Sequence, residues 1–304
     1  MDDSASRLPA AAACLATILG GSAVVATRFA VAEIDPSSVA LLRHIGTGLL
    51  FALIAAVVLR GRLFRSVARA DLPAILGLGA IQYAAFGWLF AAGLSYVPAA
   101  RGALAIATYP VQTLILAALL GRERLTMVKL AGAVIAMAGV AVAFGDKAGG
   151  EGPDMWKGDV LLLTAAFLGS VYNVFSGPYL RRNSAVTVTG IQVLFGASLI
   201  ALGVWASGAG IRLETASAPS LMALAWLITI GGVVCFYLWI WALEHTAPSR
   251  VSIAVTLNPI AAAAFGALVL GEPLTSQLAV GLLGVVIGLA LANWPARVVA
   301  AASR

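Results

Sequence analysis

The sequence is poor in charged residues. Asp, Glu, Lys and Arg make up only 11% of its 304 residues, whereas a soluble globular domain carries about 25%. Hydrophobic residues make up 61%, and a soluble protein of this composition would expose large apolar patches and aggregate. The scarcity of charge therefore excludes an ordinary soluble protein and favours the lipid bilayer as the solvent of most of the chain.

Several motifs of enzymes and pumps are also missing. The sequence contains no Gly-Lys-Ser/Thr nucleotide-binding motif, no GxSxG and no HExxH, so it indicates neither a primary pump nor a hydrolase. Its two cysteines, Cys14 and Cys235, lie in separate apolar stretches and form no CxxC motif or Cys/His cluster with metal-ligand spacing. We therefore expect no enzymatic activity, no metal and no cofactor.

What the sequence does have is long apolar segments. Each approaches the roughly 20 residues that a spanning helix needs, and none shows the ten-residue alternation of barrel strands. Short joints with Pro or charged residues separate them. The expected spans are residues 9–31, 37–59, 72–95, 99–119, 127–144, 157–179, 185–207, 219–243, 247–270 and 275–294. The sequence thus predicts an all-α integral membrane protein with ten transmembrane helices.

The distribution of charge predicts the orientation. With the N-terminus in the cytoplasm, most Lys and Arg fall on the cytoplasmic side, for example in the joint at residues 60–69. The opposite side receives an acidic joint with Asp146, Glu151, Asp154 and Asp159. Because cytoplasmic loops are enriched in Lys and Arg, we expect both termini in the cytoplasm and the protein in the plasma (inner) membrane. The basic residues occur in short clusters between spans, so no nucleic-acid partner is expected.

The chain contains an internal repeat with a constant offset of 149 residues. The pairs at this offset are Leu19-Gly20 with Leu168-Gly169, Arg101 with Arg250, Pro110 with Pro259, Glu123 with Glu272, Leu125-Thr126 with Leu274-Thr275, Gly132 with Gly281, and Gly139 with Gly288. Each copy holds five expected helices, an odd number, so the second copy must enter the membrane upside down. We predict two inverted five-helix repeats, residues 1–145 and 146–304. Secondary transporters are commonly built in this way.

These features resemble the drug/metabolite transporter superfamily, specifically its ten-helix EamA-type proteins. The marks of the resemblance are Tyr109-Pro110, Asn258-Pro259, Gly-Arg-Glu-Arg-Leu-Thr at 121–126, Gly-Glu-Pro-Leu-Thr at 271–275, and Gly20-Gly21-Ser22 before Arg28-Phe29. Within the superfamily the overall sequence is most similar to the YddG-type exporters of amino acids, aromatic ones especially. The resemblance implies export of small metabolites by alternating access.

Polar and aromatic residues inside the spans are the candidates for substrate binding, because intramembrane polar groups tend to face the bundle interior. Amides and phenols offer neutral partners for a zwitterion, and aromatic faces attract rings and ammonium groups. Aromatic residues also pack on neighbouring helices or anchor at the interface, which is the competing interpretation of each. The candidates are Gln82, Tyr83, Tyr109, Gln112, Tyr172, Asn173, Tyr237, Trp239 and Asn258.

Two prolines and two arginines complete the predicted pathway. Pro110 and Pro259 remove a backbone hydrogen bond at mid-span and are interpreted as hinges, with a static kink as the alternative. Arg101 and Arg250 head two equivalent spans and either guard the mouths of the pathway or serve as snorkelling anchors. Arg43, which precedes His44 inside the second span, is a further candidate partner for a substrate carboxylate.

No Asp or Glu falls at the middle of an expected span, although ion relays usually place one there. The only histidines are His44, beside the positive charge of Arg43, and His245 at a helix end. We therefore expect transport without an ion-coupling carboxylate. Two alternatives remain open, a proton-coupled exporter of other amphipathic metabolites or drugs, and a channel.

The expected partners are a small-molecule substrate and the bilayer. Small-residue patterns at Gly132 and Gly139, and at Gly281, Gly284 and Gly288, let helices approach closely. They predict packing of the fifth span against the tenth. A homodimer through these faces is compatible with the pattern, but a monomer is sufficient.

Overall fold

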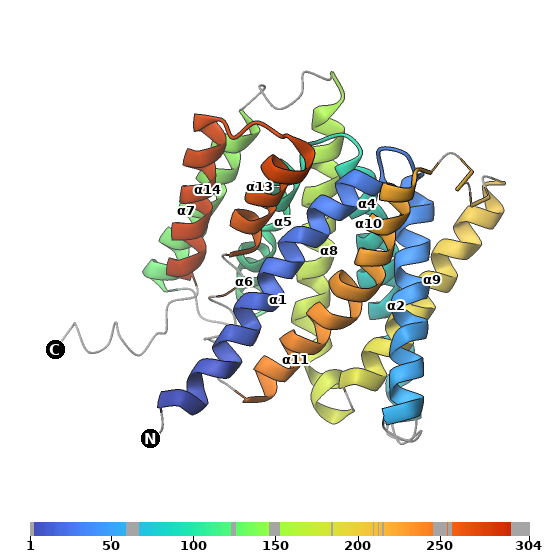
Figure 1. Ribbon diagram of the computed structural model, residues 1–304. Helices are drawn as coiled ribbons and strands as arrows, with labels where there is room; N and C mark the ends of the chain where they lie inside the picture. Colours follow the sequence, from blue (N-terminus) through green and yellow to red (C-terminus); the bar gives the residue numbers. More distant parts are fainter. Residues whose placement is uncertain are drawn as a thin grey trace.

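The computed structural model describes residues 3–58, 67–122, 126–145, 153–183, 185–208, 210–211, 213–214, 216–245, 254 and 257–292. These residues form helices and no strand, so the all-α prediction holds for the described chain (Figure 1). The elements are α1 (Asp3–Ala30), α2 (Pro36–Val58), η2 (Arg69–Asp71), α3 (Leu72–Gly79), η3 (Ala80–Ala85), α4 (Phe86–Leu94), α5 (Ala99–Ile106), α6 (Tyr109–Leu119), α7 (Met127–Phe144), α8 (Met155–Arg182), α9 (Ala185–Ala206), α10 (Ala218–Ile228), η4 (Thr229–Val234), α11 (Cys235–His245), α13 (Leu257–Leu270) and α14 (Ser276–Ala292).

Seven stretches of the described chain are long and apolar enough to cross a membrane. They are Leu8–Ala30, Pro36–Ile54, Arg69–Leu94, Ala99–Leu119, Met155–Leu180, Thr187–Ala206 and Ala218–Trp239. Three shorter apolar helices, Met127–Ala143, Leu257–Leu270 and Ser276–Ala292, occupy the remaining expected spans. Most of the first part of the expected span 247–270 lies outside the described residues.

The expected span 99–119 is two helices rather than one. α5 ends at Ile106, and α6 begins at Tyr109 after a turn at residues 107–108. Pro110 has no N–H and cannot donate to the carbonyl of Ile106, so the helix is interrupted here. The break places Tyr109 and Pro110 at the start of α6, in the middle of the span.

Two of the spans contain a π-helical segment, and the two segments occupy corresponding positions in the sequence. η3 lies between α3 and α4, and η4 lies between α10 and α11, 149 residues further along the chain. A π-helix is wider than an α-helix and is rare except as a single-turn insertion, which often marks a functional site. The offset is the one already seen in the sequence repeat.

α7 and α14 pack against each other at the left of Figure 1. Their glycines allow the contact, because a Cβ at Gly132 would lie 2.6 Å from the carbonyl oxygen of Gly288. Likewise a Cβ at Gly139 would lie 2.6 Å from the carbonyl oxygen of Gly281. The predicted packing of these two spans is confirmed. The later glycine of α7 meets the earlier glycine of α14, and the earlier meets the later. The two helices therefore run antiparallel.

The remaining helices form two bundles, each of which combines early and late parts of the chain. α1 packs on α10, α11 and α13, whereas α8 packs on α4, α5 and α6, and α2 lies beside α9. The largest group of buried apolar side chains includes Val24 of α1, Leu41 of α2, Phe90 of α4 and Leu162 of α8, and so joins the two bundles. α1 begins and α14 finishes at the same end, the lower end in Figure 1.

Candidate functional site

Two adjoining cavities lie between the bundles. The first, of about 220 Å³, is named here the Arg43 cavity, and the second, of about 210 Å³, the Asn258 cavity. The Arg43 cavity is lined by Arg43, His44, Thr47, Phe51, Tyr83, Thr189, Val193, Gly231, Gly232, Cys235, Phe236 and Trp239. The Asn258 cavity is lined by Ala16, Thr17, Gly20, Ile106, Ala107, Tyr109, Pro110, Cys235, Trp239, Asn258 and Pro259.

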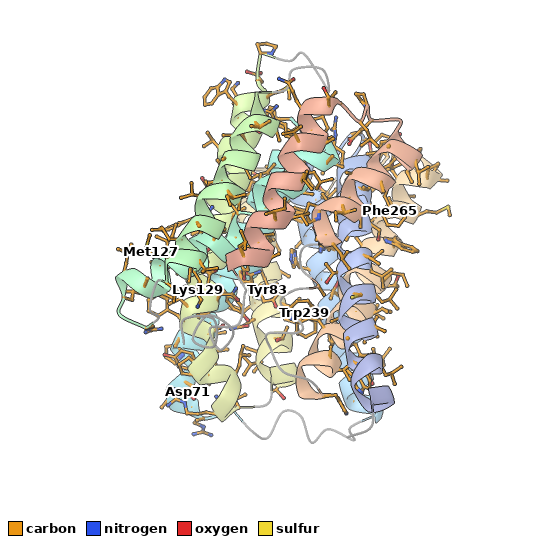
Figure 2. The ribbon with its side chains drawn as sticks, turned by 90° about the vertical axis from the view of Figure 1, so that its left-hand side faces the viewer. Asp71, Tyr83, Met127, Lys129, Trp239 and Phe265 are labelled. Carbon is orange, nitrogen blue, oxygen red and sulfur yellow. The ribbon has the colours of Figure 1, made fainter. Side chains whose placement is uncertain are left out.

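The two cavities share Cys235 and Trp239, both from α11. Tyr83 and Trp239 lie inside the helix bundle, whereas Met127 and Lys129 lie at its edge (Figure 2). The thiol of Cys235 donates to the carbonyl oxygen of Ala16 at 3.0 Å, which holds α11 against α1. The wall that separates the cavities is thus one turn of one helix, which begins directly after η4.

Aromatic rings form one wall of the Arg43 cavity. The ring of His44 meets that of Tyr83 edge-on, with centroids 5.8 Å apart, and Tyr83 meets Tyr172 in the same manner at 6.5 Å. Nδ1 of His44 lies 2.6 Å from the carbonyl oxygen of Ala40. A carbonyl can only accept, so this nitrogen carries the hydrogen. The ring also packs on Gly87, where a Cβ would collide with it.

The hydroxyl of Tyr172 continues this wall behind the cavity. It donates to Oε1 of Gln192 at 3.0 Å, and Nε2 of Gln192 donates to the carbonyl oxygen of Ile75 at 3.3 Å. Gln192 is fully buried, and its amide is satisfied on both sides. Tyr172 therefore supports Tyr83 from the side away from the cavity.

Both π-helical segments contribute lining residues to the Arg43 cavity, Tyr83 from η3 and Gly231 and Gly232 from η4. The hydroxyl of Thr47 in α2 donates to the carbonyl oxygen of Ile228, directly before η4, at 3.3 Å. A Cβ at Gly232 in η4 would collide with Thr47, and a Cβ at Gly196 in α9 would lie 2.5 Å from the Cβ of Tyr83. Each π-helical segment is thus in close contact with a helix from the other half of the chain.

In the Asn258 cavity, two side chains pack against glycines. Nδ2 of Asn258 donates to the carbonyl oxygen of Thr17 at 3.4 Å and leaves no room for a Cβ at Gly20. The ring of Tyr109 likewise fills the space beside Gly169 of α8. Asn258 and Tyr109 stand at equivalent positions of the sequence repeat, each followed by a proline that lines the cavity.

Arg43 carries the only fixed charge among the residues that line the two cavities. No Asp or Glu lines either of them. Carboxylates of the described chain lie instead toward the ends of the spans. Examples are Asp159 near the start of α8 and Asp71 at the start of α3. The site therefore combines one cation, neutral hydrogen-bonding groups and aromatic surface, an arrangement suited to a small organic anion or zwitterion.

The predicted site residues separate into two groups. Tyr83, Trp239, Tyr109 and Asn258 line the cavities together with Pro110 and Pro259, and Tyr172 supports them. The others line neither cavity. Gln82 has a buried Oε1 without a partner in the described chain, Gln112 donates to the hydroxyl of Thr108 at 2.8 Å, Asn173 is exposed, and Tyr237 is 62% exposed on the outer face of α11.

Arg101 is not at an open mouth. Its side chain is buried and makes a two-pronged ion pair with Asp159 of α8, at 2.9 Å through Nε and 2.6 Å through a terminal nitrogen. A buried, ion-paired side chain is not a snorkelling anchor, whereas the role of guarding a mouth of the pathway stays a prediction. Next to it, Glu272 accepts from the backbone N–H of Ala99 at 2.8 Å, at the start of α5. Arg250 lies outside the described residues.

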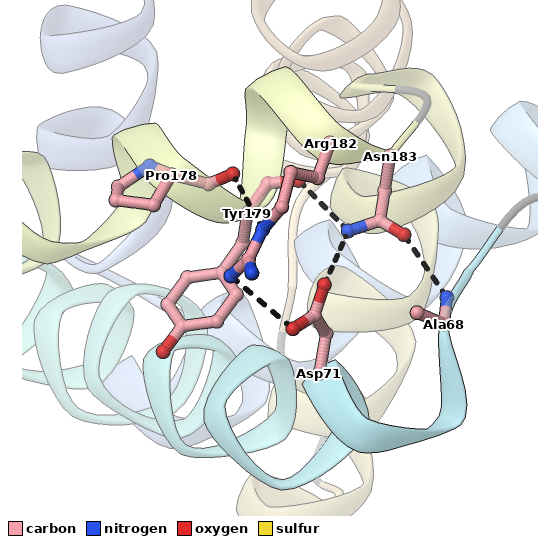
Figure 3. Close-up of polar contacts among 6 residues, drawn as sticks. All are labelled: Ala68, Asp71, Pro178, Tyr179, Arg182 and Asn183. Atoms are coloured by element: carbon pink, nitrogen blue, oxygen red, sulfur yellow. Dashed lines mark hydrogen bonds and ion pairs between the residues drawn. The ribbon is translucent and has the colours of Figure 1, made fainter.

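A second polar cluster joins the start of α3 to the end of α8 (Figure 3). Nδ2 of Asn183 donates to Asp71 at 3.0 Å, and Oδ1 of Asn183 accepts from the backbone N–H of Ala68 at 3.0 Å. Arg182 forms an ion pair with Asp71 at 3.3 Å. Like Arg101 with Asp159, this cluster attaches α8 to helices from the first part of the chain.

Sequence reasoning gave too little weight to Arg43 and His44. The available signal was an arginine inside an apolar span, a position at which charged residues are rare and functional. The part of Cys235 in the shared wall, and the glycines that admit Asn258 and Tyr109, had no signal of their own. Their roles depend on contacts between distant segments.

The chain matches the model of the EamA-like transporter family over residues 7–145 and again over residues 156–294. It is 26% identical, over 88% of this chain and 93% of the other, to an uncharacterized transporter of Archaeoglobus fulgidus. It is 28% identical, over 73% of this chain and 78% of the other, to a "probable amino-acid metabolite efflux pump" of Salmonella typhimurium. A "probable terminal-alkyne amino-acid exporter" of Streptantibioticus cattleyicolor is also 28% identical, over 71% of each chain.

One protein of known crystal structure shares the fold. It superposes with a TM-score of 0.66 over 96% of this chain and 96% of its own, at 22% sequence identity. The two family matches together cover most of the chain, and the apolar helices agree with a multi-pass membrane protein. The chain therefore belongs to the EamA-like transporter family and is a multi-pass membrane transporter.

Proposed function

We propose that this transporter exports amino acids, with a preference for aromatic ones, by alternating access. The observation that carries the proposal is the pair of adjoining cavities, which place Arg43 near the aromatic rings of Tyr83 and Trp239. Arginine binds a carboxylate, and the rings accommodate an aromatic side chain. Two relatives whose names refer to amino-acid efflux agree with this assignment, as does the resemblance to YddG-type exporters.

We further propose that the fold consists of ten spans in two inverted five-helix repeats. The antiparallel pair α7 and α14, which are equivalent in the sequence repeat, supports this proposal. When two equivalent helices pack antiparallel, the repeats that contain them point in opposite directions across the membrane. Thr47 and Gly196 are equivalent in the 149-residue repeat, and so are Tyr83 and Gly232. The contact of Gly196 with Tyr83 is therefore equivalent to the contact of Thr47 with Gly232. The two matches to the family model also fall on the two halves.

The lower end of Figure 1 is proposed to face the cytoplasm, with both chain termini there, in the plasma membrane. Arg69, Arg122 and Lys129 lie toward this end, at helix ends that Figure 1 places there. The acidic residues Glu33 and Glu272 belong to connections at the opposite end. This distribution agrees with the enrichment of Lys and Arg in cytoplasmic segments.

Alternating access is proposed to move the two bundles rather than the two sequence halves. The Asn258 cavity lies where α1, α11 and α13 of one bundle face α5 and α6 of the other. The Arg101–Asp159 ion pair and the Asp71–Asn183 hydrogen bond attach α8 to its bundle at both ends. A rocking motion between the bundles would thus open the cavities alternately without separating these contacts, and the prolines would supply the hinges.

We propose that the substrate gradient drives the transport. Coupling to protons would need a group in the pathway that changes its charge, and no carboxylate lines either cavity. The alternative of a proton-coupled exporter rests on His44 alone. A channel would need a continuous polar path, whereas the neighbours of Arg43 are mostly aromatic and aliphatic.

The test uses proteoliposomes loaded with unlabelled L-phenylalanine and supplied with labelled L-phenylalanine outside. We expect exchange by the native protein and a large loss in Trp239→Ala, because this side chain lines both cavities. Tyr237→Ala is the matched control, since Tyr237 lies two residues away on the same helix but faces outward. Exchange that is absent from the native protein, or lost equally in both variants, would refute the assignment. Concentrative uptake driven by a pH step alone would instead favour the proton-coupled alternative.

A further inference from the structure

The positive charge of Arg43 has no counter-ion in the described chain. Arg43 lies inside the span Pro36–Ile54 and lines its cavity, and no described carboxylate lies within ion-pair distance of it. Elsewhere in the described chain, carboxylates pair with other cations: Asp159 with Arg101, Asp154 with Lys157 and Asp71 with Arg182. A cation at this depth is costly unless it is paired, so the cavity favours an anionic group brought in by the substrate.

We propose that the carboxylate is the group this site selects and that an α-amino group is dispensable. The ligand class is then small monocarboxylates with an apolar side chain, with or without an ammonium group. The inference deepens the proposed function and rests on it. A planar guanidinium matches a carboxylate with two parallel hydrogen bonds. The pair formed in the cavity would be electrically neutral.

The ammonium group of an amino acid finds no comparable partner. Neither cavity has a carboxylate among its lining residues. Thr47, Asn258 and His44 donate hydrogens to the carbonyl oxygens of Ile228, Thr17 and Ala40, so they offer an ammonium uncharged acceptor atoms and no anion. An α-ammonium is also held close to its own carboxylate and therefore close to Arg43, which repels it. Neutral acceptors and aromatic faces would have to offset its desolvation without a counter-charge.

The rest of the Arg43 cavity favours an apolar side chain. Phe51 and Phe236 meet edge-on with centroids 5.3 Å apart, and both line the cavity. Tyr83 and Trp239 complete an aromatic surface. A phenyl group can therefore be buried while its carboxylate reaches Arg43.

Three ligands with the same phenylethyl frame distinguish the contribution of the carboxylate from that of the ammonium group. L-phenylalanine carries carboxylate and ammonium, 3-phenylpropionate only the carboxylate, and phenethylamine only the ammonium. Binding to the purified protein is measured by titration calorimetry, and transport is measured in proteoliposomes. We expect 3-phenylpropionate to bind at least as tightly as phenylalanine, and phenethylamine to bind at least about tenfold more weakly, since a charged hydrogen-bonded pair is absent.

Arg43→Gln should weaken both carboxylates by about tenfold or more and should not weaken phenethylamine, because the charge removed is one that repels its ammonium group. The matched control is Arg28→Gln, near the end of α1, because Arg28 contacts the carbonyl oxygen of Ser95 and lines neither cavity. This variant should keep the native order of affinities. If Arg43→Gln does not fold, Arg43→Lys serves the same purpose. It keeps the charge without the planar fork, and should weaken only the two carboxylates.

The outcomes distinguish the inference from the proposed function. Phenethylamine binding as tightly as 3-phenylpropionate, or carboxylate binding unaffected in both Arg43 variants, would overturn the inference. Transport of phenylalanine without binding of 3-phenylpropionate would overturn it while leaving the amino-acid exporter intact. Transport of 3-phenylpropionate but of no amino acid would support it and refute the proposed function. Binding of none of the three ligands would refute both.

Discussion

The two halves of the chain repeat their backbone but not their cavity chemistry. η3 and η4 correspond at the 149-residue offset, yet the residue equivalent to Tyr83 is Gly232, and the residue equivalent to Arg43 is Gln192. Gln192 is buried and hydrogen-bonded through both its oxygen and its nitrogen, whereas Arg43 lines a cavity. In the proposed two-repeat fold, the repeat would supply a symmetric frame, and a few unmatched side chains would turn one side of it into the candidate binding site.

The links between the halves differ in the same way. At the upper end, Glu33 accepts from the backbone N–H of Ser217 at 2.8 Å. The equivalent positions at the lower end are Arg182 and Ala68, which belong to the cluster around Asp71. Glu33 is exposed, but Asp71 and Asn183 are buried. Equivalent positions thus form an exposed contact at the upper end and a buried hydrogen-bonded network at the lower end.

The largest expected effect comes from breaking the symmetric frame. Gly139→Leu and Gly281→Leu should each destabilise the protein by about 1–3 kcal/mol or more, because the new side chain meets backbone that cannot yield. The two effects should be similar, since each glycine faces the other helix. Thermal unfolding in detergent measures them. Gly203→Leu is the control, because open space surrounds that position, and an equal loss there would remove the packing explanation.

The second prediction tests whether the substrate uses the Asn258 cavity, which residues from both halves line. Tyr109→Ala and Asn258→Ala should each weaken the binding of an aromatic amino acid by on the order of 1–3 kcal/mol, or tenfold and upwards, because a binding partner is lost. Titration of the purified variants measures the effect. Native affinity in both folded variants would show that the substrate does not use this cavity.

The third prediction concerns the equivalent prolines. Pro110→Ala and Pro259→Ala should slow transport several-fold while changing affinity little, because they restore a backbone N–H at the point where a hinge is proposed. Exchange rates and binding constants are compared for the same variants. If the rates in both variants equal those of the native protein, the prolines are packing features.

The last prediction contrasts the two links, and the smallest effect of all is expected from the exposed one. Asn183→Ala should cost about 1–3 kcal/mol, because it leaves the buried Asp71 with fewer partners. Glu33 is fully exposed, and hydrogen bonds from Ser217 and Ser220 hold the pKa of its carboxyl below the ordinary value of 4.5. Its small contribution is therefore present above that value and lost as the pH falls through the lowered pKa.

Unfolding midpoints measured against pH test both statements. Native protein and Glu33→Gln should differ slightly at neutral pH and converge in acid. The Asn183→Ala variant should remain less stable at neutral pH by the larger amount. A Glu33→Gln effect equal to or greater than that of Asn183→Ala would contradict the contrast between the exposed and the buried link.

The all-helical fold and the close pairing of α7 with α14 were predictable from the sequence, because apolar length and glycine spacing are local signals. The interruption of the fourth expected span near Pro110 was partly predictable for the same reason. The π-helical segments were not. Their sequences, Ala80–Ala85 and Thr229–Val234, show no local signal for a wider turn, and the contacts that accompany it come from α2 and α9.

The sequence identified about half of the candidate site. Polar and aromatic residues at mid-span identified Tyr83, Tyr109 and Asn258, but the same criterion selected Tyr237, which faces outward. Residue type alone does not tell which face of an apolar helix is turned inward when almost every face is apolar. The partner of Arg101 could not be read from the sequence either, since Asp159 is brought to it only by the packing of α5 on α8.

Substrate is proposed to bind where the two cavities meet, and Cys235 offers the most direct test of this proposal. In a Cys14→Ser background, Cys235 is the only cysteine, and it lines both cavities. The measurement is the rate at which N-ethylmaleimide alkylates Cys235, with and without saturating L-phenylalanine. We predict that phenylalanine slows the alkylation and that alkylated protein no longer exchanges substrate. An unchanged rate at saturating substrate, together with full transport after alkylation, would contradict the claim.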